Sequence, residues 1–241
     1  MIDEELKIEE YRQLLQQMHS LCEEMPEIIF TKYFDSNKYL YSLYIEAFNS
    51  IKGFCVLLGN GGLIPQACVV LRMALEHTET IRVLEMHKEL QVDYVEHHKY
   101  RFEIRNKENR NELIKEHYKG KFNPKNKKPL DFLEYGWLKP LDEDYGLDSL
   151  IKVSKIQEQD NAFQTWKDEF NHWTHGIMEF ANLTSDINGP IIYGHTLLSI
   201  AAKLLDILVC EFYNESKFNF VIDSIDYREI FIDSYKSTRK D

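Results

Sequence analysis

The chain has 241 residues, of which 44% are hydrophobic and 29% are charged, and its formal net charge is −11 at pH 7. This length is enough to bury a substantial core, and the acidic balance argues against a protein that coats nucleic acid or anionic membrane over its whole surface. The absence of a long uncharged apolar run and the acidic, amphipathic N-terminal stretch argue against a membrane span and a signal peptide, which predicts a cytoplasmic protein.

Apolar residues recur at helical spacing along most of the chain, which predicts an all-α, multi-helix bundle in a single domain over 1–241. The first helix is expected to end before Pro26. Short extra helices are expected over 129–156, and the tail from Phe218 onward fits a strand or a short helix. The core helices are expected over residues 3–24, 36–58, 64–87, 89–117, 159–181 and 191–213.

Charged side chains interrupt the apolar stripe of the helix expected over 64–87. Arg72 and Glu76 are four residues apart and lie on nearly the same face of a helix, and Glu79 projects from that side as well. Because a buried arginine without a partner is strongly destabilising, the spacing predicts an Arg72–Glu76 ion pair. The pair has two interpretations: an internal ion pair that fixes helix register, or the anion-binding part of a functional site.

A functional site of this kind also needs a group that transfers protons near neutral pH. His175, in the stretch FNHWTHG, precedes a helix-weakening glycine in the helix expected over 159–181. If that helix faces the centre of the bundle, His175 can act as general acid or base while Arg72 holds a phosphate-like charge. The alternative is a core histidine satisfied by a hydrogen bond.

The same helix supports a metal-dependent alternative. Glu76 and Glu79 form a Glu-x-x-Glu pair, the kind with which all-α nucleoside triphosphate pyrophosphohydrolases hold Mg²⁺. Those enzymes also use a second acidic pair, Glu-x-x-Asp, and residues 90–125 contain none. The preferred interpretation therefore includes no metal and no cofactor.

The segment 119–130, KGKFNPKNKKPL, is rich in lysine and contains no carboxylate, which predicts an exposed basic loop. Residues 105–128 hold nine lysines and arginines against three glutamates, with Tyr118 and Phe122 interleaved. Such a patch can contact an RNA or DNA backbone, and the alternative is a solvated loop. The candidate nucleic-acid contacts are Lys119, Lys121, Lys125, Lys127 and Lys128.

Two segments carry a family resemblance: residues 41–84, which end in a helix with the pattern Ala-x-x-x-x-Arg-x-x-x-Glu, and residues 166–176, WKDEFNHWTHG. Together they cover somewhat less than a quarter of the chain. They resemble an uncharacterised bacterial family of all-helical proteins, a domain of unknown function, that is similar to HEPN and AbiV-like abortive-infection proteins. This resemblance implies a HEPN-like bundle that dimerises. It also implies metal-independent ribonuclease chemistry with Arg72, Glu76, His175 and Asn171 as site residues.

Two details qualify what the resemblance implies. Phe170 and Asn171 stand where a HEPN helix has an Arg-Asn pair, so the catalytic arginine has to come from another helix, as Arg72. Arg72 and His77 match the Arg-x-x-x-x-His spacing of HEPN ribonucleases. Five residues at about 100° each place their side chains about 140° apart on an ideal helix, so His175 is the preferred histidine.

The sequence thus predicts a cytoplasmic, HEPN-like homodimer, because the apolar helices around 36–58 and 191–213 offer more apolar surface than one bundle needs. Three functions are in competition. The first is an enzyme, or a degenerate enzyme, of nucleic-acid or nucleotide metabolism, such as a metal-independent ribonuclease. The second is a non-catalytic interaction module in phage defence or stress response, with a structural Arg–Glu–His network. The third is the Mg²⁺-dependent nucleotide pyrophosphohydrolase that uses Glu76 and Glu79.

Overall fold

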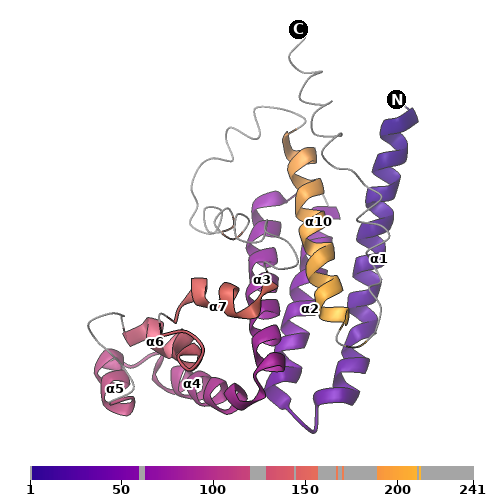
Figure 1. Ribbon diagram of the computed structural model, residues 1–241. Helices are drawn as coiled ribbons and strands as arrows, with labels where there is room; N and C mark the ends of the chain where they lie inside the picture. The colour runs from indigo at the N-terminus through magenta and orange to yellow at the C-terminus, as the bar shows by residue number, and fades with distance from the viewer. Residues whose placement is uncertain are drawn as a thin grey trace. The chain divides into compact units, whose positions relative to one another are not determined.

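The protein is described here by a computed structural model, drawn in Figure 1. The residues that the structure describes are 2–59, 63–119, 129–143, 145–156, 167, 170, 189–210 and 212. Every regular element within these ranges is a helix, which confirms the predicted all-α, multi-helix architecture.

The chain divides into two compact units, which are described separately. The first unit consists of residues 1–78 and 165–241, and the second of residues 79–164. The described helices of the first unit are α1 (Ile2–Tyr33), α2 (Lys38–Gly59), the N-terminal part of α3 (Ile64–Met86) and α10 (Gly189–Cys210). The second unit contains the end of α3, η1 (Lys88–Leu90), α4 (Gln91–Ile104), α5 (Arg110–His117), α6 (Pro129–Tyr135), η2 (Gly136–Leu138) and α7 (Leu147–Ser154).

In the first unit, α1, α2 and α10 pack against one another, as Figure 1 shows. The bounds of α2, α3 and α10 agree within about two or three residues with the helices predicted from the apolar periodicity. Their shared core consists mainly of aliphatic and phenylalanine side chains with 0–1% exposure, among them Met18, Ala47, Phe48, Phe54 and Leu204.

Helix α1 differs from its prediction, because it continues through Pro26 to Tyr33. The predicted end at residue 24 was wrong. A proline inside a helix removes one backbone hydrogen bond at a cost of about 3 kcal/mol. Met25, Ile29 and Tyr33 are 0%, 0% and 7% exposed, and burying three side chains of this size offsets that cost. Proline therefore marks no boundary here.

The single helix predicted over 89–117 is split into η1, α4 and α5, so this prediction was also wrong. The residues between α4 and α5, RNKEN, are all exposed and polar and contribute nothing to a core. Ile104 and Ile114, on either side of them, are 2% and 0% exposed. Ten residues of continuous helix would turn these two side chains about 80° apart. The break between α4 and α5 allows both isoleucines to reach the core.

The second unit has a core rich in aromatic rings. The imidazole of His97 stacks on the Tyr118 ring at a centroid distance of 4.8 Å and contacts the Phe132 ring at 5.5 Å, and Phe132 in turn contacts Tyr145. At the end of α3, Arg82 Nε donates a hydrogen bond of 3.0 Å to the carbonyl of Ser154. This bond ties the last turns of α3 to the C-terminal end of α7. None of the described helices is both long and apolar enough to cross a membrane.

Candidate functional site

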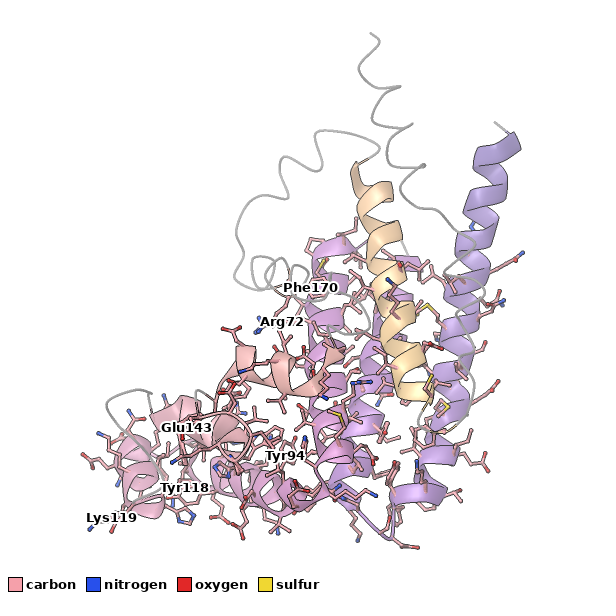
Figure 2. The ribbon with its side chains drawn as sticks, viewed as in Figure 1. Arg72, Tyr94, Tyr118, Lys119, Glu143 and Phe170 are labelled. Atoms are coloured by element: carbon pink, nitrogen blue, oxygen red, sulfur yellow. The ribbon has the colours of Figure 1, made fainter. Side chains whose placement is uncertain are left out.

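Arg72 and Glu76 form the ion pair that their spacing predicts. Arg72 Nε donates to Glu76 Oε1 at 2.8 Å, and both residues lie in α3. Their side chains are 21% and 34% exposed, so the pair lies at the surface of the first unit and is not internal. Figure 2 shows the Arg72 side chain extending outward from α3. A partly exposed guanidinium held by a carboxylate can be reached by an anion from solvent.

The apolar pattern of α3 explains this placement. Leu71, Ala74 and Leu75 are 0–1% exposed and turn one side of the helix into the core. Thr78 follows on that side, where its hydroxyl donates to the carbonyl of Ala74 at 2.7 Å. The opposite side of the helix carries Arg72, Glu76 and Met73, and the Met73 side chain is 45% exposed.

Glu79 is not part of this exposed side. It lies seven residues after Arg72, which is almost the same direction on a helix, but it is 0% exposed. Arg72, Glu76 and Glu79 were predicted to project from one side of the helix. In the structure only Arg72 and Glu76 reach solvent, and Glu79 is buried. Within the described parts of the chain, no group of three or more His, Cys, Asp or Glu side chains is placed to hold a metal ion. The exposure difference between Glu76 and Glu79 lends no support to a shared Mg²⁺ site.

His77 directly follows Glu76 and is a functional candidate that the spacing argument set aside. Burial lowers the pKa of its imidazole, and the carboxylates of Glu46 in α2 and of Glu76 act in the opposite direction. Nδ1 of His77 is buried and has no hydrogen-bond partner within the described residues. The ring is therefore neutral near pH 7, the form in which an imidazole accepts a proton. Glu76 thus pairs with Arg72 and also acts electrostatically on His77.

The signal for His77 was present in the sequence as the Arg-x-x-x-x-His spacing. Angular separation on an ideal helix compares only the directions in which the Arg72 and His77 side chains leave the helix. It does not account for Glu76, which pairs with Arg72 and also acts electrostatically on His77.

His175 and Asn171, the other predicted site residues, lie outside the described residues. From the helix predicted over 159–181 the structure describes Lys167 and Phe170, which are helical and 3% and 0% exposed. The proposal that His175 lies near Arg72 therefore stays a prediction.

The predicted basic loop, 119–130, is described only at its two ends: at Lys119, and at residues 129 and 130, which begin α6. Lys119 is exposed and follows the end of α5, whereas Lys121, Lys125, Lys127 and Lys128 lie outside the described residues. Tyr118 differs from its prediction, because its ring is 5% exposed and belongs to the core of the second unit (Figure 2). It was expected to alternate with lysines on a nucleic-acid surface, but its contacts with His97 and Phe132 bury it.

The fold and site define a class: an all-α protein whose third helix presents an Arg–Glu ion pair beside a partly buried histidine with a lowered pKa. No family model, curated protein or solved structure matches the chain. The resemblance to HEPN and AbiV-like proteins accordingly stays a prediction.

Proposed function

We propose that this protein is a HEPN-like enzyme of nucleic-acid or nucleotide metabolism that cleaves RNA without a metal ion. Arg72 binds a phosphate of the substrate, Glu76 orients the guanidinium, and a histidine transfers the proton. The observation that carries the proposal is the Arg72–Glu76 bond of 2.8 Å at a partly exposed position. The hydrogen bond orients the two charged side chains, and solvent can reach both.

The chemistry that fits these groups uses the 2′-hydroxyl of RNA as nucleophile. A neutral histidine accepts the hydroxyl proton as the 2′-oxygen attacks phosphorus, and the bond to the 5′-oxygen breaks. The protonated histidine, or a second one, then supplies a proton to the leaving oxygen. Arg72 stabilises the negative charge that develops on the phosphate oxygens.

Two histidines are candidates for this role. His77 is supported by its lowered pKa and its position next to Glu76. His175, with Asn171 nearby in the chain, is supported by the resemblance alone. The two candidates are separated by single substitutions.

The test is turnover of single-stranded RNA and of nucleoside triphosphates by the purified protein, with and without EDTA. We expect EDTA-resistant RNA cleavage that falls about 100-fold or more in Arg72→Ala, as when an enzyme loses one group that stabilises a transition-state charge. Arg12→Ala, at an exposed position in α1, is the matched control. His77→Ala and His175→Ala identify the histidine, because only the variant that removes the proton-transfer group should lose turnover while remaining folded.

The other outcomes have equally direct meanings. A wild-type protein that turns over neither RNA nor nucleotides overturns the enzymatic proposal and leaves the non-catalytic interaction module. EDTA-sensitive hydrolysis of triphosphates supports the pyrophosphohydrolase that uses Glu76 and Glu79.

We also propose that the protein is a cytoplasmic homodimer that acts in phage defence or stress response, in line with the resemblance to abortive-infection proteins. An exposed aromatic cluster in the first unit supports self-association. Phe30 is 48% exposed and stacks on Phe34 at a centroid distance of 4.3 Å, with Tyr41 edge-on to both rings. Sedimentation equilibrium of the wild type and of Phe30→Ser tests this, and a monomeric wild type contradicts it.

A further inference from the structure

The outer side of α4 carries an exposed aromatic ring that the core does not explain. Tyr94, His97 and Ile104 are 2–7% exposed and form the inner side of the helix, which contacts α6 and η2. Phe102 points away from them and is 67% exposed, the largest fraction among the exposed large hydrophobic residues that the structure describes. A single exposed phenylalanine is common on protein surfaces, so its meaning depends on the residues around it.

The surroundings of Phe102 indicate what kind of ligand it meets. The guanidinium of Arg105 lies over the ring, with its central carbon 4.4 Å from the ring centroid. Lys107 and Arg110 follow at exposed positions in the turn and at the start of α5. Residues 99–119 contain seven lysines and arginines against four glutamates, in a chain whose net charge is −11, and one of the seven, Arg101, pairs with Glu134 at 2.9 Å. A planar ring within a locally basic surface complements a polyanion that carries planar groups.

Contacts between α4 and α5 hold this surface in a fixed arrangement. The rings of Tyr100 and His117 stack at a centroid distance of 3.9 Å with an angle of 13° between their planes. The hydroxyl of Tyr100 also donates to the carbonyl of Leu113 at 3.0 Å. The basic residues of α5 are therefore positioned relative to Phe102 by packing within the same unit.

We infer that Phe102 stacks against an unpaired base of single-stranded nucleic acid, while Arg105, Lys107 and Arg110 contact its phosphates. Aromatic side chains beside a cationic groove bind single strands because every base has a flat face, and a duplex keeps those faces covered. A protein partner for an apolar helix side would require several neighbouring apolar residues, and the charges around Phe102 oppose that. The inference rests on the proposed function in one respect, which is that the substrate is RNA. The Phe102 surface would hold an RNA strand for the proposed enzyme.

The experiment is fluorescence anisotropy of a labelled 12-nucleotide single strand with the full chain, next to a duplex of the same sequence. We expect Phe102→Ala to weaken single-strand binding about five- to 100-fold, the usual effect of removing one stacked aromatic. Phe102→Trp should retain binding. Val92→Ala, which truncates a side chain 65% exposed on the same helix, is the matched control and should change binding less than twofold. Lys107→Ala combined with Arg110→Ala should reduce the dependence of binding on salt.

Equal binding by wild type, Phe102→Ala and Val92→Ala would overturn the inference, as would a duplex that binds as tightly as the single strand. A Phe102→Ala variant that binds normally but no longer self-associates in sedimentation would assign the ring to a protein interface instead. Binding is measured without turnover, so an inactive wild type that still binds through Phe102 refutes the proposed enzyme but not this site. An active enzyme insensitive to Phe102→Ala refutes the site but not the enzyme.

Discussion

The two units are built from different kinds of contact. In the first, helices of 32, 22 and 22 residues share a core of mainly aliphatic and phenylalanine side chains, in which the rings of Tyr33 and Tyr44 also stack. In the second, α4 to α7 have 14, 8, 7 and 8 residues, and the rings of His97, Tyr118, Phe132 and Tyr145 pack between them.

The difference concerns what holds each helix in place. A helix of seven or eight residues is not stable by itself in water, so it depends on the side chains that attach it to its neighbours. A long helix distributes its burial over many residues, and no single contact decides whether it forms. The first unit should therefore respond to lost volume, and the second to small changes in ring geometry.

The largest effect is expected in the first unit, from Phe54→Ala in α2. Phe54 is 0% exposed, and truncation of a fully buried phenylalanine costs about 3–5 kcal/mol. Urea unfolding followed by circular dichroism measures the loss. Val56→Ala, two residues away at a side chain 44% exposed, is the control and should cost about 0.5 kcal/mol or less. A loss below about 1 kcal/mol for Phe54→Ala would contradict the description of this core.

The next effect compares one glycine from each unit. A Cβ atom on Gly136 would lie 2.8 Å from two carbons of the Phe132 ring and 3.0 Å from His97 Nε2, and this ring is 1% exposed and closely packed. We expect Gly136→Ala to destabilise the protein by about 1–3 kcal/mol.

Gly53→Ala is the matched substitution in α2, where the added Cβ meets Val70 Cγ1 at an ordinary 3.5 Å. Because alanine is the better helix former, Gly53→Ala should raise stability by up to about 1 kcal/mol. Chemical denaturation of both variants tests the pair. If both substitutions raised, or both lowered, the free energy of unfolding, the proposed contrast between the two units would be wrong.

A smaller effect is expected at Tyr118 in the second unit. Its hydroxyl is buried and has no hydrogen-bond partner within the described residues, so Tyr118→Phe should raise stability by about 1 kcal/mol near neutral pH. Burial also raises the pKa of Tyr118 to about 12. Above pH 10 the unfolded tyrosine ionises while the folded one stays neutral, so the wild type loses stability between about pH 10 and 12.

The phenylalanine variant lacks that ionisation, so its advantage over the wild type should widen as the pH rises. Denaturation at pH 8 and pH 11 measures this change. A constant advantage would show that Tyr118 ionises equally in both states, and a shrinking one that it ionises more easily in the folded state; either would contradict the raised pKa.

The smallest stability effect is expected for the Arg72–Glu76 pair. Partly exposed pairs four residues apart in a helix contribute about 0.3–0.5 kcal/mol. A double-mutant cycle with Arg72→Ala and Glu76→Gln should give a coupling energy of this size. A coupling above about 2 kcal/mol would instead indicate that the pair is part of the architecture of the first unit.

Part of the fold could be predicted from sequence because it depends on local pattern. The helices over 36–58, 64–87 and 191–213 have continuous apolar periodicity, and the structure confirms them as α2, α3 and α10. The hydrogen bond between Arg72 and Glu76 likewise follows from four-residue spacing. Pro26 and the split between α4 and α5 were mispredicted, because each is decided by what neighbouring helices bury.

The candidate site shows the same division between local and tertiary information. Spacing alone identified Arg72 and Glu76, but not that Glu79 is buried while Glu76 is partly exposed. The exposed Phe102 could not be distinguished from a core aromatic by its residue type, and the buried Tyr118 could not be distinguished from a surface one.

The sequence by itself determined the all-α class, three of the long helices and the pairing of the arginine with its carboxylate. Each of these depends on residues within a few turns of one another, whose geometry the backbone fixes. Only the tertiary structure decided which side of each helix is covered, which pKa values burial shifts and which rings remain in water. Those properties depend on residues distant in the chain, whose positions local periodicity does not specify.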